Sequence, residues 1–341
     1  MILSFYDKDF NGLQNNASLL IEDKSFKLTK RPIEMNDFEC RCEPFTENIQ
    51  PTFLVVKNDR GSNKELIYSC LAGIPELIDG NRTYIYGTDL KAIFSSDVIL
   101  EYGTYVNISQ LIAYIFTEWN NQVNKDNIPC TLEFVDGSEE VLLDTLVPEI
   151  GKSIYNALDE IKTYLTAYNL YINSEIDIIN KVVKFYIGKT LSAEKPQNIK
   201  LKDYGIRNYG KWIADVNEVQ AYYLNGDIWE KGLDWILTSD NQVTVTEELR
   251  DIYPVKKLIV TSTESIDEAN KSALKELLTY RFNEDLTIPA SGINASFRTK
   301  FNIILEDGTQ YKSLPCGELR YNSDGLYEIQ IGYRYTGIDF I

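Results

Sequence analysis

Turn dipeptides between apolar runs constrain the fold of this chain more than any other feature. Asp-Gly or Asn-Gly separates runs of Ile, Val, Tyr, Phe and Leu at Asp79-Gly80, Asp136-Gly137, Asn225-Gly226, Asp307-Gly308 and Asp324-Gly325. These dipeptides supply the positive φ angles that a tight turn between antiparallel strands requires. The run from Ile178 to Ile187 predicts a further hairpin that turns at Asn180-Lys181. The sequence therefore predicts a chain rich in β-hairpins.

Helical spacing of apolar residues is confined to a few segments, each behind a residue that can cap a helix. These segments are 107–119 behind Asn107, 153–168 behind Ser153, and 265–282 behind Ser265. In the first and last segments, a Gln or Glu three residues after the cap completes a capping box. With few helices and many strands, we expect a β-rich α+β fold.

Length and composition indicate a folded protein of two or three domains. The chain has 341 residues, of which 44% are hydrophobic, so it can bury a sizeable core. It lacks a run of about 18 apolar residues, the length that a membrane-spanning helix needs. Its first residues also lack the basic and apolar regions of a secretory signal.

The charged residues exclude several classes of function. The chain has no histidine, and its 51 acidic and 34 basic residues give a net charge of −17. Without imidazole, Ser-His-Asp and Cys-His triads and histidine-based zinc sites are excluded. The excess of carboxylates also disfavours binding to a nucleic-acid backbone or to an anionic membrane.

The cysteines indicate a protein made in a reducing compartment. They are odd in number and scattered: Cys40, Cys42, Cys70, Cys130 and Cys316. A disulfide framework or a zinc site would show paired spacings or accompanying histidines. We expect buried free thiols.

One metal-binding fragment is present. Asp7-Lys-Asp9-Phe-Asn11-Gly12 matches the first half of an EF-hand loop. The closing position falls on Ser18, where calcium requires a bidentate Glu, and the chain before Asp7 is too short for an entering helix. We interpret the fragment as a strand and a polar turn, and expect no metal site.

Adjacent acids offer candidates for carboxylate chemistry. Glu139-Glu140 and Glu247-Glu248 are examples. A glycosidase holds two carboxyl groups across a cleft and raises the pKa of one. Neighbouring acids more often mark a solvated face, so we expect no catalytic residues.

Clustered aromatic residues offer a candidate sugar platform, made of Trp212, Trp229, Trp235, Tyr222 and Tyr223. In strands such residues are more often core or interface anchors. Phosphate-binding glycine loops are absent from the sequence. We expect neither a cofactor nor enzymatic activity.

Two segments of the chain echo each other. Glu76-Leu77 and Glu318-Leu319 each precede an Asp-Gly turn and a β run, and both runs end in glycine at the same spacing from the turn. The echo is weak evidence for two related β-barrels.

Beyond these patterns, much of the chain resembles the tail-hub proteins of siphophages, also called tail-associated or tail-tip proteins. The resemblance is carried by Lys202-Asp-Tyr-Gly-Ile-Arg-Asn-Tyr-Gly-Lys-Trp-Ile-Ala-Asp-Val-Asn-Glu-Val, then Trp235-Ile-Leu-Thr-Ser-Asp-Asn and Tyr253-Pro-Val. The helix and hairpin between Ile154 and Ile187, and the opening Phe5-Tyr-Asp-Lys-Asp-Phe-Asn, are similar to the same family. The match lies in pattern and order.

The resemblance implies a structural phage or prophage protein at the virion tail tip, made in the bacterial cytoplasm. It implies a homotrimer like the baseplate hub of contractile-tailed phages. Two β-barrel-like domains per subunit would form a pseudo-sixfold ring on the hexameric distal tail ring. Inserted α/β domains would close the tube until DNA passes, without binding DNA specifically or entering a membrane.

On this basis we expect three regions. Residues 1–106 with 190–250 would form the first β-barrel-like hub domain, 107–189 an inserted α/β domain, and 251–341 the second β-barrel-like domain, with a helix near 265–282. The chain stops directly after a strand pattern, so we expect the structural hub alone, or the N-terminal fragment of a longer protein. The family's lysin activity is not carried over.

Two other functions stay open at this point: a carbohydrate-binding receptor of the tail tip, and a carboxylate-dependent cell-wall hydrolase. The net charge of −17 adds a hypothesis to the hub interpretation. Part of this acidity would line the lumen and keep DNA from adhering during ejection.

Overall fold

The structure is a computed structural model of the chain. It describes residues 1–13, 18–22, 24–45, 50–58, 66–78, 81–101, 105–124, 128–143, 153–190, 195–204, 208–211, 216–238, 243–249, 256–278, 280, 284–306, 308 and 310–332. Across these residues it has three α-helices and many strands in several sheets. This confirms the predicted β-rich α+β class.

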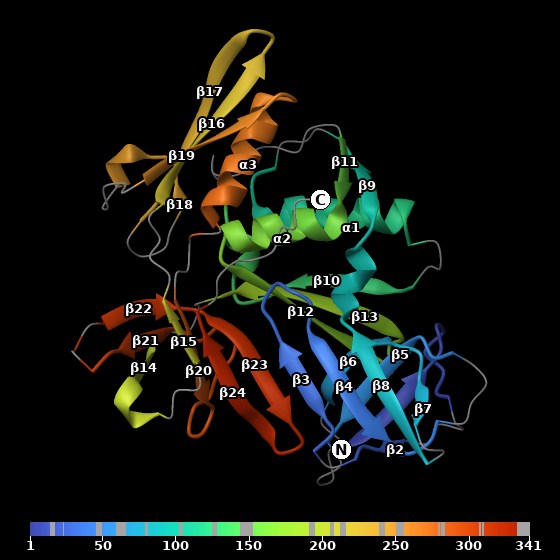
Figure 1. The fold of residues 1–341 in the computed structure, drawn as a ribbon. Helices are drawn as coiled ribbons and strands as arrows, with labels where there is room; N and C mark the ends of the chain where they lie inside the picture. The colour runs from blue at the N-terminus through green and yellow to red at the C-terminus, as the bar shows by residue number, and fades with distance from the viewer. Residues whose placement is uncertain are drawn as a thin grey trace.

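Two β lobes lie side by side, with two α/β units above them in the view of Figure 1. The N-terminal β lobe, at the lower right, contains β1 (Ile2–Tyr6), β2 (Leu19–Leu20), β3 (Lys27–Lys30), β4 (Asp37–Cys42), β5 (Phe53–Lys57), β6 (Leu66–Ala72), β7 (Glu76–Ile78) and β8 (Arg82–Thr88). Alternate side chains of strands such as β4 point into a core of Leu, Phe, Val and Cys residues, as the two-residue period of a half-buried strand requires.

The C-terminal β lobe, at the lower left of Figure 1, draws its strands from the last part of the chain and from two short segments before it. It contains β14 (Gln197–Lys200), η4 (Leu201–Asp203), β15 (Asn208–Lys211), β20 (Glu284–Pro289), β21 (Phe301–Ile304), β22 (Gln310–Leu314), β23 (Cys316–Asn322) and β24 (Gly325–Ile331). It has a separate hydrophobic core around Phe301 and Ile329.

A single twelve-stranded sheet runs through both lobes. Its order is β15-β20-β24-β23-β3-β4-β8-β6-β5-β1-β2, with β7 beside β8. The lobes join where β3 pairs antiparallel with β23, so that Lys30 lies opposite Leu319 and Leu28 opposite Tyr321. Strands at opposite ends of the chain thus complete one sheet.

The first α/β unit follows the N-terminal lobe in the chain. It contains η2 (Leu90–Phe94), β9 (Asp97–Leu100), α1 (Ile108–Gln122), β10 (Cys130–Phe134), η3 (Ser138–Glu140), β11 (Ser153–Asn156), α2 (Ala157–Ala167), β12 (Leu170–Asp177) and β13 (Val182–Lys189). The outer edge of β12 rests on the N-terminal lobe: the N–H of Ile172 donates to Pro32 O at 2.8 Å, and that of Ile176 to Ser69 Oγ at 2.9 Å.

The second α/β unit contains β16 (Val216–Asn225), β17 (Ile228–Leu237), β18 (Val243–Thr244), η5 (Glu247–Leu249), β19 (Lys256–Ser262) and α3 (Ile266–Leu278). Its sheet has the order β18-β17-β16-β19, and α3 packs against β16, β17 and β19. The largest hydrophobic core extends through both α/β units and includes Phe10 and Phe53 of the N-terminal lobe, whose rings stack at 4.8 Å.

These pairings bear on the domain boundaries expected from the sequence, which stay a prediction. Residues 190–250, expected in the first hub domain, supply β14 and β15 to sheets with the C-terminal strands, and β16 to β18 to the separate four-stranded sheet. Residues 107–189 supply α1, α2 and the sheet of β10, β12 and β13 to the first α/β unit.

Most of the predicted turns are confirmed. Hairpins turn at Asn225-Gly226, where Gly226 has a φ of 63°, at Asp324-Gly325, and at Asn180-Lys181, where Lys181 has a φ of 53°. β21 and β22 also pair antiparallel around Gly308. Asp307 and the pair Asp79-Gly80 lie outside the described residues.

The hairpin predicted at Asp136-Gly137 is wrong. Both residues have the positive φ angles of such a turn, 57° and 72°. The turn leads from β10 into η3, however, and β10 pairs in parallel with β13. The dipeptide therefore fixes the turn conformation without fixing which strand follows.

Two of the predicted helix caps are confirmed and one is wrong. Asn107 accepts the N–H of Gln110 at 3.0 Å, and Ser265 Oγ accepts that of Glu268 at 3.1 Å. The cap predicted at Ser153 is displaced, because Ser153–Asn156 forms β11, paired with β9. The helix begins at Ala157, and Asn156 accepts the N–H of Asp159.

The cysteines are free, and four of the five are buried, as expected; Cys130 is half-buried. Burial raises the pKa of Cys42 and of Cys130 to about 12. Both thiols therefore stay protonated near neutral pH.

We expect Asn156→Ala to destabilise the chain by about 1 kcal/mol, because the first turn of α2 loses the acceptor of an amide N–H. Denaturant unfolding measures the change. Asn156→Ser, which retains a capping oxygen, is the control and should retain most of the stability. Equal losses in both variants would contradict the cap assignment.

Candidate functional site

The EF-hand fragment is a turn held by its own side chains. Asp7 Oδ1 accepts the N–H groups of Asp9 and Asn11 at 2.9 and 2.8 Å, and Asp7 Oδ2 accepts the Asn11 amide at 3.1 Å. Ser18, at the position of the closing calcium ligand, shares a hydrogen bond with Ser4 at 2.9 Å. The fragment is thus the strand and polar turn that we expected.

Among the described residues, no group of three or more Cys, Asp or Glu side chains is placed to hold a metal ion. The adjacent acids Glu139-Glu140 and Glu247-Glu248 are exposed, in η3 and η5. Within the part of the chain that the structure describes, no helix is long and apolar enough to cross a bilayer.

The described tryptophans of the candidate sugar platform lie on opposite faces of their sheet. Trp235 is buried beneath α3 and donates its N–H to Asn270 O at 3.0 Å, whereas Trp229 is half exposed near the β16–β17 turn. Trp235 lies opposite Val219 and Trp229 opposite Leu224. Positions 219 and 224 of one strand face opposite sides of the sheet. Trp212 lies outside the described residues.

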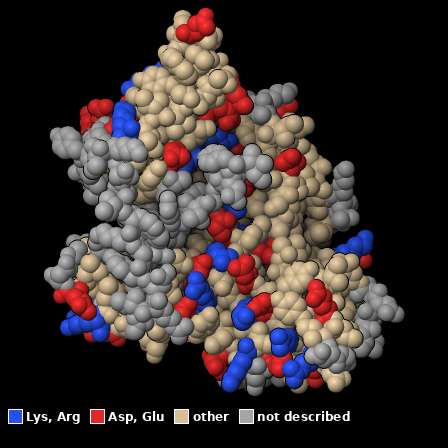
Figure 2. Space-filling view, in the orientation of Figure 1, with Lys and Arg blue, Asp and Glu red and all other residues tan. Residues whose placement is uncertain are grey.

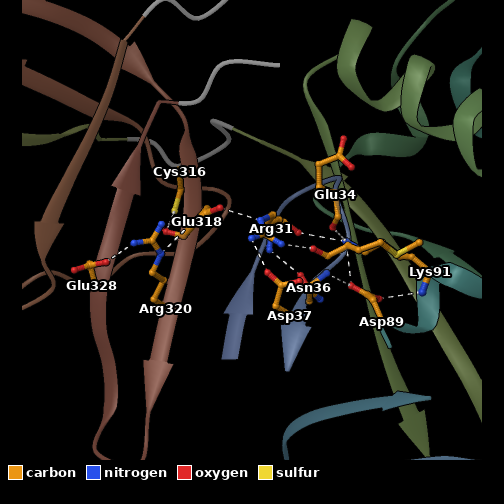
Figure 3. Close-up of polar contacts among 11 residues, drawn as sticks. Arg31, Glu34, Asn36, Asp37, Asp89, Lys91, Cys316, Glu318, Arg320 and Glu328 are labelled. Atoms are coloured by element: carbon orange, nitrogen blue, oxygen red, sulfur yellow. Dashed lines mark hydrogen bonds and ion pairs between the residues drawn. The ribbon is translucent and has the colours of Figure 1, made fainter. Parts of the chain in front are cut away.

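The most elaborate polar site lies where the two β lobes meet (Figure 3). Arg31, in the loop after β3, donates from Nε to Glu318 of β23 at 2.8 Å. Its other nitrogens donate to Met35 O and to Asp37 Oδ2, both at 2.7 Å. The guanidinium thus binds acceptors in the N-terminal lobe and a carboxylate of the C-terminal lobe at the same time.

Glu318 lies between two guanidinium groups. Its second oxygen accepts from Arg320 Nε at 3.0 Å and Nη2 at 2.6 Å, and Arg320 Nη1 donates to Glu328 at 2.5 Å. The Glu318 side chain is only 15% exposed. Burial opposes ionisation of Arg31, but hydrogen bonds to Asp37 and Glu318 outweigh it and raise the pKa of Arg31. Charge-assisted hydrogen bonds of this kind are the strong ones.

The loop that carries Arg31 wraps around a buried lysine. Lys91 of η2 is 1% exposed, and its ammonium donates to the carbonyl oxygens of Arg31 at 3.4 Å, Ile33 at 3.3 Å and Glu34. Asp89, also buried, lies 3.3 Å from the ammonium and balances its charge. A buried charge requires such a partner and a set of hydrogen bonds.

The same loop contacts a helix of the first α/β unit. The Glu34 carboxylate pairs with Lys162 of α2 at 2.9 Å. Acidic and basic side chains are intermixed across the middle of the face in Figure 2, where the lobes meet. This arrangement of paired ions joins three parts of the molecule.

In the sequence Glu318 stands out only as part of the internal echo, and Arg31 and Lys91 belong to no recognisable motif. The counterpart of Glu318 in the echo, Glu76, is exposed in β7. The two partners of the main ion pair are 287 positions apart, so no local spacing could have linked them.

No family model matches this chain, and no curated protein matches it. Solved structures do match over nearly its whole length. The prophage tail protein gp18 from Listeria monocytogenes EGD-e has a TM-score of 0.57 at 12% identity, covering 98% of this chain and 95% of that chain. The tail protein from Neisseria meningitidis MC58 has a TM-score of 0.53 at 12% identity, covering 98% and 96%.

The 43 kDa tail protein of prophage MuSo2 from Shewanella oneidensis has a TM-score of 0.50 at 12% identity, covering 98% of both chains. The chain therefore has a tail-protein fold, which confirms at the level of fold the resemblance predicted from the sequence.

We expect Glu318→Gln to destabilise the chain by about 1 to 3 kcal/mol, because it removes the negative charge between two partly buried guanidinium groups. Glu39→Gln is the matched control. It breaks the exposed pair Lys27–Glu39 of the same sheet and should have a smaller effect. Urea denaturation compares the two, and equal losses would show that the junction is no more than a surface ion pair.

Proposed function

We propose that this chain is the structural hub of a phage or prophage tail tip or baseplate. It trimerises, docks on the distal tail ring and closes the tail tube until DNA is ejected. The observation that carries the proposal is the match of fold over 98% of this chain and 95% of a prophage tail protein. A match of this extent covers both β lobes and both α/β units.

The junction between the two β lobes is a second observation in favour of the proposed ring. In the proposal, the two lobes are β-barrel-like hub domains that alternate around a trimeric ring, giving six similar positions. Such a ring requires a fixed angle between the lobes. The sheet that continues through β3 and β23, with the Arg31–Glu318 pair beside it, connects the two lobes directly.

The α/β units then form the part that closes the tube. We propose no catalytic role, and the chain acts through binding surfaces at the virion tail tip after synthesis in the host cytoplasm. DNA passes without specific binding, and part of the net charge of −17 faces the lumen to repel its phosphates.

Size-exclusion chromatography with light scattering tests the proposal. We expect a particle of three chains. The fraction of protein in this trimer should stay the same over a wide range of concentrations, because permanent assemblies bury on the order of 2,000 Å² or more. A monomer that persists at high concentration would contradict the trimeric hub.

Two assays separate the hub from its rivals. Purified chain should release no soluble fragments from peptidoglycan, and it should not bind host glycans. Release that disappears on mutating an acidic pair would establish a hydrolase. Glycan binding that disappears with Trp229→Ala would establish a receptor protein.

A further inference from the structure

The loop of residues 31–36, hereafter the junction loop, contacts three parts of the molecule through three different groups. Its Arg31 side chain binds Glu318 of the C-terminal β lobe. Its carbonyl oxygens bind Lys91 of η2, and its Glu34 side chain binds Lys162 of α2. Figure 3 shows the first two sets of contacts as one line from Glu328 to Lys91.

The backbone of Arg31 is fixed from both sides by groups that depend on η2. Its carbonyl oxygen accepts from the Lys91 ammonium at 3.4 Å. Its N–H donates to Asn36 Oδ1 at 2.7 Å, and the N–H of Asn36 donates to Asp89 Oδ2 at 2.8 Å. Asp89 also accepts the N–H of Lys91 at 3.0 Å, so one carboxylate ties η2 to the junction loop.

The Lys91 side chain therefore places a positive charge at the centre of the junction loop. An ammonium has three N–H groups, and here three carbonyl oxygens of one loop and a carboxylate oxygen surround it. The ammonium offsets the mutual repulsion of these carbonyl dipoles, which would otherwise favour their pointing apart.

We propose that Lys91 is a positioning residue for the Arg31–Glu318 pair, and that the junction loop couples the first α/β unit to the connection between the β lobes. A displacement of α2 or η2 then weakens the contact between the lobes. The biological consequence rests on the proposed function: in a hub, movement of the closing part would be transmitted to the lobes docked on the tail.

Hydrogen exchange tests the coupling. Lys162→Met removes the ion pair to Glu34 while keeping a residue that favours helix. We expect the amides of β23 to exchange about threefold faster or more, although Lys162 contacts the junction loop and not β23. Lys162→Arg should restore the wild-type rate. An unchanged rate in β23, with faster exchange confined to α2 and the junction loop, would overturn the proposal.

Lys184→Met is the matched control. Lys184 forms an ion pair with Asp177 at 2.8 Å in the same α/β unit, at the β12–β13 hairpin, away from the junction loop. We expect its loss to leave exchange in β23 unchanged. Faster exchange in this variant too would show that any weakening of the unit reaches β23, which would also overturn the specific route.

A double-mutant cycle measures the same coupling in solution. If the sites are coupled, the effects of Lys162→Met and Glu318→Gln on the unfolding equilibrium constant will depart from a simple product by about threefold or more. The effects of Lys184→Met and Glu318→Gln should multiply. Lys91→Met paired with Glu318→Gln gives the direct cycle, and the Lys162 cycle decides the question if Lys91→Met does not fold.

The oligomeric state is measured on the same samples. A monomer that shows the coupling would contradict only the proposed hub. A trimer in which the effects of Lys162→Met and Glu318→Gln on the unfolding equilibrium constant simply multiply would contradict only the coupling.

Discussion

The architecture depends on the pairing of β3 with β23 and on the ion pair beside it. Without this short ladder the twelve-stranded sheet would separate into two sheets with open edges, and unpaired strand edges readily join other chains. Backbone pairing alone does not specify register over so few residues. The Arg31–Glu318 pair adds that specificity, because the planar guanidinium that donates to Glu318 from Nε is also held by Met35 O and Asp37 through its other nitrogens.

The junction also shows how a small protein region tolerates buried charge. Lys91 and Asp89 are almost fully buried, and replacing such pairs by apolar residues is often neutral or stabilising in other proteins. In this protein the buried pair orients the junction loop. A hydrophobic side chain in place of Lys91 could fill the volume, but it could not collect the carbonyl groups of a loop that must present Arg31 to the other lobe.

Local chemistry was predictable from the sequence, and long-range partnership was not. Turns such as Asn225-Gly226 and caps such as Asn107 follow from a few neighbouring residues, so their signals are in the sequence itself. At Asp136-Gly137 the same chemistry misled, because the partner strand β13 lies about fifty residues further on and is parallel. The junction has no local signal at all. Only the resemblance to tail proteins, carried by order along the chain, anticipated the fold as a whole.

The pairing of β3 with β23 has a consequence for synthesis. On the ribosome, β3 emerges early, whereas the strand that covers its edge is encoded almost 290 positions later. At a translation rate of about 5 to 20 residues per second, that edge stays bare for roughly 15 to 60 s. During this interval the nascent N-terminal lobe carries an unpaired strand edge, of the kind that can pair with another chain before β23 has been made.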